Sequence, residues 1–539
     1  MKRTRRASVA IVVAALLTLG SARARTIEFD AATIADINAA FDAGTLTSES
    51  LTRMCLARIT AFDRKGPSLH AVMALNPHAI EQAKALDAER KAKGRRSLLH
   101  GIPVVLKDNY DTFDMPTTGG SVLLEGSIPS KDAFVVKKLR DAGAIILAKV
   151  NMSEFASGGT YSSLGGQSLN PHDLTRGPSG SSGGTGVAIA AAYALIGLGT
   201  DTGGSIRGPA TTNGIAALKP THGLLSRSGI IPLALSFDTG GPMARSVYDV
   251  AAALGVMTGV DAADAATAKS EGKSLTDYTT GLRADALKGT RIGIARDFLG
   301  ADPDVEWVME AAFASMKSAG ATLIDVRYPK WLLDAKEDFY QTIRYPEFVV
   351  QIADYLKGTG PKYPKSLAEM IERANQFTGT RADGARPNPS RWTLFKRELE
   401  SNSTDDYRYK AVRDFGLPMV RAVVEGMLDA QQLDAIAYPT TSRRPGLITA
   451  TAGTGTSVGS ALAASGLAAS NIANLTGFPD LIVPAGFTGD SLPVGLSFLG
   501  RAFSDQKLLS IGYSFEQATK ARRRPVHTPA LPGEAVERP

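Results

Sequence analysis

The chain has 539 residues, of which 44% are hydrophobic and 21% are charged, a composition typical of an ordinary soluble globular protein. Its formal net charge of +7 falls to +2 when residues 1–24, with five basic and no acidic residues, are set aside. This balance gives no indication of a surface for nucleic acid or for a membrane, and the single cysteine, Cys55, excludes an internal disulfide.

Residues 1–24 have the order of a secretory signal peptide. Four basic residues are followed by an apolar run over Val9–Leu19 and by Ala22-Arg23-Ala24, which fits a small-x-small cleavage site. The apolar run is shorter than the roughly 20 residues that cross a bilayer. We therefore expect cleavage and export, which predicts a periplasmic or secreted protein without stable membrane association. An uncleaved anchor is the alternative.

Helical patterns dominate the first part of the remaining chain. Two amphipathic helices are predicted within 31–63, separated by Gly44 and with Thr47 as the N-cap of the second. Cys55 lies at an apolar position of that second helix, so we expect it to be a small buried hydrophobe. A third helix is predicted over 77–93.

Short apolar strands then alternate with helices. The sequence predicts a strand at Val104–Leu106 that Lys107 terminates, a helix over 132–142 and a strand at Ala144–Leu147. This order is typical of an α/β core with parallel strand pairs. A lysine after a strand, taken alone, is most often a solvated strand end.

Two glycine-rich loops that contain serine flank a small, apolar segment in the middle of the chain. The first loop, 180–184, lies at the start of a predicted buried helix, Gly183–Ala194. A short strand, Ala194–Gly199, is predicted to follow this helix, and the second loop, 201–207, comes after that strand. Free N–H groups at a helix N-terminus favour negative charge. Consecutive glycines let successive N–H groups point toward one position, which is what an oxyanion hole requires.

These two loops supply the candidate catalytic serines. We predict that Ser205 is a nucleophile and that Ser181 helps to activate it. Ser182 also fits the G-x-S-x-G pattern of an α/β-hydrolase, but that nucleophile must follow a strand, and turn residues precede it here. On the residues alone, a purely structural role for both loops as tight turns stays open.

The remainder of the chain gives coarser predictions. A loop over 236–246 leads into a helix, 260–287 is a polar connection, 330–430 is helical and charged, and 446–470 is of low complexity. Further elements are predicted as strands at Arg291–Ala295, Ala321–Val326, Asp434–Tyr438, Leu481–Pro484 and Val494–Leu499, and as helices over 247–258, 303–319 and 505–520.

Several motifs in a fixed order give the chain a family resemblance. They are Gly101-Ile-Pro-Val-Val-Leu-Lys-Asp-Asn109, Lys149–Phe155, Gly180–Gly184, Gly199–Arg207, Leu218–Thr221 and Asp238–Arg245. The spacing is 74 from Lys107 to Ser181 and 24 from Ser181 to Ser205. On these motifs the chain resembles the amidase signature family from about residue 32 to 525. Its ends, at Ser491–Gly500 and Tyr513–Gln517, are most similar to secreted bacterial peptide amidases, whereas Asp-Thr-Gly-Gly-Ser in the nucleophile loop is the form of the wider family.

This resemblance implies the fold and the domain organisation. The expected fold is α/β, with a large twisted mixed β-sheet whose two faces are covered by helices. One catalytic domain would span 25–539, with 330–430 as a variable helical insertion. We expect the loop at 155–161 and this insertion to set the preference for the acyl group.

The resemblance also implies a Ser-Ser-Lys triad. Ser205 would attack the amide carbonyl, Ser181, on a cis peptide bond, would relay the proton, and Lys107 would be the terminal base. The implied oxyanion hole consists of Thr202, Gly203 and Gly204. The implied substrate-binding residues are Gly158, Gly159 and Tyr161.

This role makes a physical demand on Lys107. The reference pKa of lysine is about 10.4, and a base that works near neutrality needs a pKa about three units lower, which corresponds to about 4 kcal/mol. Burial and hydrogen bonds from the two serines can supply this difference. The apolar run Val104–Leu106 is consistent with burial.

The predicted activity is hydrolysis of carboxamide C–N bonds through an acyl-serine intermediate, with a small carboxamide or a peptide C-terminal amide as the substrate. The resemblance implies no cofactor, and the six scattered histidines give no metal site. We expect no nucleic-acid partner and a monomer or a homodimer. Two alternatives stay open: the glutaminase component of a tRNA-dependent amidotransferase complex, and a binding protein with an inactive amidase fold.

Overall fold

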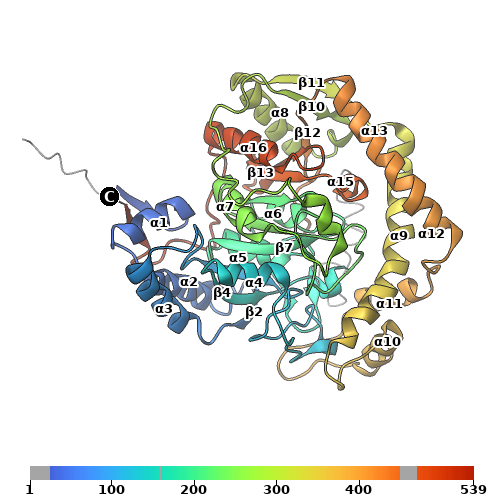
Figure 1. The fold of residues 1–539 in the computed structure, drawn as a ribbon, viewed down its shortest axis with the longest axis horizontal. Helices are drawn as coiled ribbons and strands as arrows, with labels where there is room; N and C mark the ends of the chain where they lie inside the picture. Colours follow the sequence, from blue (N-terminus) through green and yellow to red (C-terminus); the bar gives the residue numbers. More distant parts are fainter. Residues whose placement is uncertain (1–24, 158–159, 449–469, 539) are drawn as a thin grey trace, which may run out of the picture.

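The computed structural model describes residues 25–157, 160–448 and 470–538. An eleven-stranded sheet runs through them in the order β11-β10-β12-β14-β13-β8-β9-β7-β3-β4-β2 (Figure 1). Its strands are β2 (Val72–Leu75), β3 (Pro103–Lys107), β4 (Ile145–Val150), β7 (Ile196–Asp201), β8 (Ala216–Lys219), β9 (Thr239–Ala244), β10 (Arg291–Ala295), β11 (Thr322–Val326), β12 (Ala435–Pro439), β13 (Asp480–Phe487) and β14 (Pro493–Leu499).

Both strand directions occur in this sheet. β3 pairs in parallel with β4 and β7, and β10 pairs in parallel with β11 and β12, whereas the other neighbours are antiparallel. β3, β4 and β7 are buried at every position, as expected for parallel strands that helices cover on both faces. The predicted α/β fold with a large mixed sheet is therefore confirmed.

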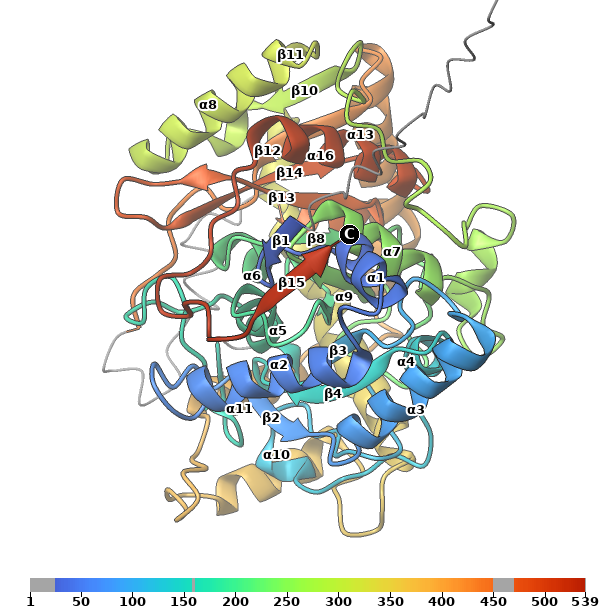
Figure 2. The same cartoon turned by 90° about the vertical axis from the view of Figure 1, so that its left-hand side faces the viewer.

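Helices flank the sheet in two groups (Figure 2). The first group packs side by side in a row and consists of α4 (Phe134–Asp141), α7 (Val247–Met257), α16 (Asp505–Thr519) and α8 (Pro303–Ser318). The second group is a pair in mutual contact, α5 (Gly183–Ala190) and α6 (Arg207–Thr212). The N-terminal helices α1 (Ile34–Asp42), α2 (Ser48–Phe62) and α3 (Ala79–Lys93) support this core from outside.

The two ends of the described chain meet in a small second sheet. β1 (Arg25–Glu28) pairs antiparallel with β15 (Ala535–Arg538) (Figure 2). A third, two-stranded sheet joins β5 (Tyr161–Ser162) to β6 (Gly166–Gln167). Within the described ranges, no helix combines the length and the apolar character needed to cross a bilayer.

The region over 330–430 is helical and covers one side of the molecule, at the right of Figure 1. It consists of α9 (Lys330–Lys357), α10 (Leu367–Gln376), α11 (Pro389–Leu399), α12 (Tyr407–Ala411), a π-helical turn at Val412–Gly416 and α13 (Leu417–Ala430). α9 packs against α11 and against α15 (Ser470–Thr476). This packing brings the N-terminal half of α9 close to the middle of the sheet.

Most predicted elements begin and end within a few residues of the observed ones. Thr47 caps α2 through reciprocal hydrogen bonds with Ser50, and Gly94 ends α3 with a φ of 81°. Cys55 is free and buried in α2, as predicted. These local signals were sufficient to predict the ends of the elements, because each signal depends on residues that are close in sequence.

Two corrections concern segments next to the central strand β7. The helix predicted over Gly183–Ala194 ends at Ala190, because Ala192 adopts a φ of 56° and the chain turns there toward β7. The loop predicted over 236–246 contains β9, whose Gly-Gly-Pro sequence lacks a strand pattern but pairs with β7 and β8. Most of the low-complexity stretch predicted over 446–470 lies outside the described residues.

Candidate active site

The carboxyl ends of two parallel strands bring the candidate residues together. Lys107 ends β3, and the neighbouring strand β7 leads directly into the loop that carries Ser205. The first serine loop lies at the start of α5, which packs on β3 and β7. The N–H of Ser182 donates to the carbonyl of Ser205 at 3.2 Å, so the two serine loops are hydrogen-bonded to each other.

Lys107 is fully buried beneath these loops. Its Nζ lies 2.7 Å from Oγ of Ser181, 2.7 Å from Oγ1 of Thr200 and 3.4 Å from the carbonyl oxygen of Thr200. Burial lowers the pKa of Lys107 to about 7, although the charges of Asp201 and Asp238 act in the opposite direction. Near neutral pH, a large fraction of this side chain is therefore an uncharged amine.

The two serines differ in accessibility. Ser181 is buried, and the peptide bond from Gly180 to Ser181 is cis. Ser205 is partly exposed. A buried hydroxyl beside the amine and a more accessible hydroxyl on the adjoining loop suit a proton relay and a nucleophile, respectively.

The loop after β7 is held in shape by a carboxylate. Asp201 accepts the N–H of Gly204 at 2.8 Å and the N–H of Ile206 at 3.0 Å. The N–H of Gly204, which the family resemblance assigns to the oxyanion hole, is therefore bonded within the loop in this structure. The N–H groups of Thr202, Gly203 and Ser205 have no acceptor among the described residues, so these three are available to bind an oxyanion.

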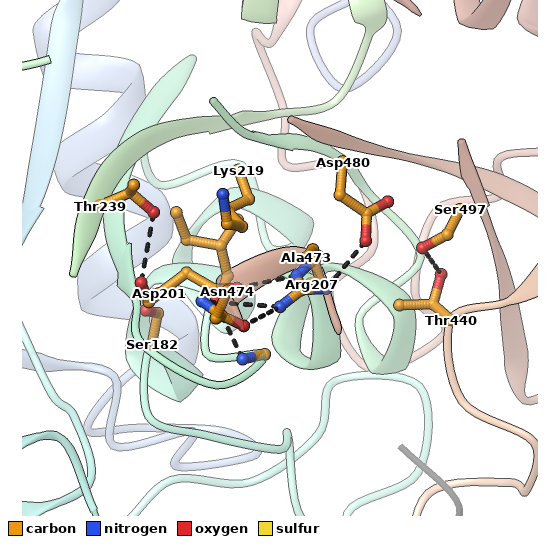
Figure 3. Close-up of polar contacts among 12 residues, drawn as sticks. Ser182, Asp201, Arg207, Lys219, Thr239, Thr440, Ala473, Asn474, Asp480 and Ser497 are labelled. Atoms are coloured by element: carbon orange, nitrogen blue, oxygen red, sulfur yellow. Dashed lines mark hydrogen bonds and ion pairs between the residues drawn. The ribbon is translucent and has the colours of Figure 1, made fainter. Parts of the chain in front are cut away.

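A buried ionic network supports the same loop (Figure 3). Arg207 donates to Asp201 at 3.1 Å, to Asp480 at 2.8 Å and to the side-chain oxygen of Asn474 at 2.7 Å. Asn474 in turn donates to Asp201 at 2.9 Å. Burial disfavours the charge of Asp201, but the Arg207 guanidinium outweighs it and holds the pKa of that carboxyl below its usual range.

Removal of Arg207 is expected to destabilise the whole protein. The Arg207→Met variant leaves two buried carboxylates unpaired, and breaking a buried ion pair costs about 3–5 kcal/mol. We expect the free energy of unfolding, measured by denaturant titration, to fall by that amount. The matched control is Arg408→Met, whose ion pair with Asp338 is about half exposed and is expected to contribute little to stability. Equal losses in the two variants would contradict this account of the network.

Ser182 occupies a structural position between the loops. Its Oγ donates to the carbonyl of Thr200 at 3.2 Å and accepts the N–H of Thr200 at the same distance. It is fully buried, and the segment before it is not a strand. The α/β-hydrolase interpretation of this serine is therefore wrong.

The implied substrate-binding residues are only partly described. Gly158 and Gly159 lie outside the described residues. Tyr161 is buried at the start of β5, where its hydroxyl donates to the carbonyl of Arg386 at 3.2 Å and accepts from the Arg386 guanidinium at 3.0 Å. Tyr161 is therefore hydrogen-bonded to the segment between α10 and α11. Both of these hydrogen bonds involve the hydroxyl of Tyr161.

A small pocket lies beside the loop after β7. Thr200, Thr202 and Asp238 form its polar side, and the rest of its lining is mostly apolar, with Ala156, Ile230, Ile231, Leu233 and Leu235. Asn109 also lines it, with a buried Oδ1 that has no hydrogen-bond partner among the described residues. The described residues contain no cluster of three His, Cys, Asp or Glu side chains that could hold a metal ion.

Sequence reasoning did not single out Thr200 or Asn109. Both stand inside the quoted motifs, one residue before Asp201 and two after Lys107. The signal that could have found Thr200 is its position at the end of a strand parallel to that of Lys107, since the ends of parallel neighbours meet at one edge.

A family model described as Amidase matches residues 50–509. The chain belongs to the amidase family. The A subunit of the glutamyl-tRNA(Gln) amidotransferase of Chloroflexus aurantiacus is 36% identical to it over 500 residues, which cover 90% of this chain and 96% of that protein.

Solved structures of the amidase family are similar over nearly the whole chain. The native peptide amidase of Stenotrophomonas maltophilia has a TM-score of 0.80 and 37% identity, covering 93% of this chain and 99% of that chain. An amidase family protein from Bacillus anthracis has a TM-score of 0.80 and 33% identity, covering 92% of each chain. The chain is thus an amidase-family enzyme that acts on C–N bonds of amides. The proteins similar to it include both an amidotransferase subunit and a peptide amidase.

Proposed function

We propose that this amidase hydrolyses carboxamides through an acyl intermediate on Ser205, with Ser181 and Lys107 as its proton relay. The observation that carries the proposal is the buried Lys107 amine 2.7 Å from Ser181, on the loop that is hydrogen-bonded to the backbone of Ser205. The pKa of Lys107 of about 7 supports a base that works near neutral pH.

Lys107 takes the hydroxyl proton of Ser181, and Ser181 in turn takes the hydroxyl proton of Ser205. At the same time, the oxygen of Ser205 forms a bond to the carbonyl carbon of the amide. The N–H groups of Thr202, Gly203 and Ser205 stabilise the oxyanion. The C–N bond then breaks, and the proton held by Lys107 returns through Ser181 to the leaving amine. Water hydrolyses the acyl-serine by the same route, which releases the carboxylate and restores Ser205.

Thr200 is proposed to orient the lone pair of the base. A neutral amine has two N–H groups and one lone pair. The carbonyl oxygen of Thr200 can only accept, and Oγ1 of Thr200 is the second acceptor, so the lone pair of Lys107 is left to face Ser181. Asn109 donates to the same Oγ1 at 3.1 Å and holds it in place.

The Thr200→Val variant is expected to lower kcat by about 10- to 100-fold, because the amine loses an orienting acceptor without a change in side-chain shape. The variant also removes an acceptor from the ammonium form, so the pKa on the acid limb of the kcat/KM profile should fall below about 7. Thr200→Ser is the matched control and should retain activity and the same limb. A Val variant with normal kcat would refute the orienting role.

For the substrate, we propose a small carboxamide or a peptide C-terminal amide. The support for the peptide form is the 37% identity to a peptide amidase over nearly the whole chain. Release of ammonia from an amidated dipeptide, compared with acetamide and an aryl amide, tests it. No turnover of the dipeptide would reject the peptide form and leave the small carboxamide.

The second candidate is a glutaminase component of a tRNA-dependent amidotransferase, which the 36% identity to the Chloroflexus aurantiacus protein favours. Purification of the chain with bound partner proteins, and hydrolysis of glutamine in preference to other amides, would support it. We favour an enzyme that works alone as a monomer or a homodimer, and mass measurement of the purified protein in solution distinguishes the two candidates.

We also propose that residues 1–24 direct export to the periplasm or the medium. The support is the order of basic, apolar and small residues in that segment. Determination of the N-terminus of the protein from a periplasmic fraction should show cleavage after Ala24. A full-length protein confined to the cytoplasm would reject the proposal and favour the amidotransferase alternative.

A further inference from the structure

A tyrosine from the helical insertion lies against the nucleophile loop. The hydroxyl oxygen of Tyr340, on α9, is 2.7 Å from the position that a Cβ on Gly203 would occupy. Gly203 stands two residues before Ser205 and offers one of the available N–H groups of this loop. A side chain at position 203 would therefore collide with Tyr340, and the absence of one lets the phenol approach the backbone that binds the reacting carbonyl.

The ring of Tyr340 is held in place, whereas its hydroxyl is free to bind a substrate. The ring stacks on Phe237 with centroids 5.4 Å apart and an interplanar angle of 24°. Tyr340 is partly exposed, and its hydroxyl forms no hydrogen bond with the described residues. Burial raises the pKa of Tyr340, so the phenol stays protonated and remains a hydrogen-bond donor.

The sheet order defines which part of a substrate this donor faces. β7 lies between β3, which carries Lys107, and β9, which starts two residues after Phe237. Thr239 of β9 pairs with Asp201 at the end of β7, so Phe237 and Tyr340 flank the nucleophile loop on the side opposite to Lys107. The leaving amine must face Lys107 and Ser181, because it receives its proton there. The acyl part of the substrate is then directed toward Tyr340.

We propose that Tyr340 contacts the substrate and donates a hydrogen bond to an acceptor in its acyl part, so that the enzyme prefers acyl groups with a carbonyl near the scissile bond. N-acylated amino acid and peptide amides are the substrate class that has such a carbonyl. This inference rests on the proposed acyl-Ser205 chemistry. It gives the hydroxyl of Tyr340 a role in the choice of substrate.

The test compares two acyl groups of the same shape, as p-nitrophenyl esters of N-acetylglycine and of 4-methylpentanoic acid. The second lacks the acceptor carbonyl. Acylation is measured from the release of p-nitrophenolate in the wild type and in Tyr340→Phe, which keeps the ring and its stacking on Phe237. Tyr407→Phe, at an exposed tyrosine of α12, is the matched control, and Ser205→Ala gives the background rate.

We expect Tyr340→Phe to lower kcat/KM about five- to tenfold for the N-acetylglycyl ester and to leave the 4-methylpentanoyl ester unchanged, because one hydrogen bond is lost from the first only. Equal losses for both esters, or no loss for either, would overturn the inference. The proposed function fails in a different way. Either the wild type is not acylated by either ester, or it is acylated but releases no ammonia from any amide.

Discussion

The Ser205→Ala variant is expected to lose essentially all amide hydrolysis while it keeps the fold. Loss of a serine nucleophile costs about 10⁴- to 10⁶-fold in kcat when the rest of the site is intact, because no covalent intermediate can form. Ser205 is partly exposed and its side chain is not part of the ionic network around Asp201, so its removal leaves that network unchanged. The expected result is a normal melting temperature with activity at the background rate.

Ser182→Ala is the informative control for this experiment. Ser182 is adjacent to Ser181 in the same loop, but its Oγ forms two hydrogen bonds of 3.2 Å, one to the carbonyl oxygen and one from the N–H of Thr200. Its removal should lower stability by about 1–3 kcal/mol through unpaired buried groups and leave kcat within a few-fold of the wild type. A catalytic loss in Ser182→Ala as large as that in Ser205→Ala, at equal stability, would contradict the assigned roles.

The Lys107→Met variant is expected to separate catalysis from stability. Removal of the base should lower kcat by about 10²- to 10⁴-fold. In the wild type, kcat/KM should rise with pH through about 7 and then level off, because only the neutral amine accepts a proton. This acid limb should be absent in the variant, measured from pH 5 to 9 with a neutral amide.

The same pKa predicts the opposite effect on stability. Burial lowers the pKa of Lys107 to about 7, whereas the unfolded chain has the ordinary value of lysine, so between these values the unfolded state binds more protons. The lysine therefore opposes folding most strongly below about pH 7, and the opposition fades as the pH rises toward the unfolded value. Lys107→Met should raise the free energy of unfolding near pH 6, by up to about 4 kcal/mol, and have a smaller effect at pH 9.

Lys149→Met provides the comparison. Lys149 is equally buried, but it lies 3.4 Å from Asp108, so its loss leaves a buried carboxylate without its cation. We expect this variant to be destabilised by about 3–5 kcal/mol. If Lys107→Met were destabilised to the same extent near pH 6, the interpretation of Lys107 as an unpaired buried base would be wrong.

The sequence singles out those residues of the candidate site that lie in short motifs. Ser181 and Ser205 could be named as candidates because each stands in a glycine-rich loop, whereas the role of Lys107 was implied by the family resemblance. An α/β core with parallel strand pairs was also predictable, since β3, β4 and β7 are short apolar runs between helices, whereas the mixed sheet was implied by the family resemblance. What these motifs have in common is that the physical signal lies within a few residues.

Contacts between distant segments were not predictable in this way. Tyr340 reaches Gly203 across 137 positions, and Asp480 reaches Arg207 across 273, and neither residue has a distinctive local pattern. The prediction of a loop in place of β9 is wrong because its strand character depends on pairing with β7 rather than on its own residues. The hydrogen bond from Gly204 to Asp201 was not predictable either, because it depends on how the loop folds back.

Acylation of Ser205 under the control of Lys107 is tested most directly by intact-protein mass measurement. After brief exposure to a fluorophosphonate or a p-nitrophenyl ester, we expect one adduct on the wild type, none on Ser205→Ala and slow formation on Lys107→Ala. Peptide mapping should locate the adduct at Ser205. An adduct that persists in Ser205→Ala, or that maps to Ser182, would contradict the account.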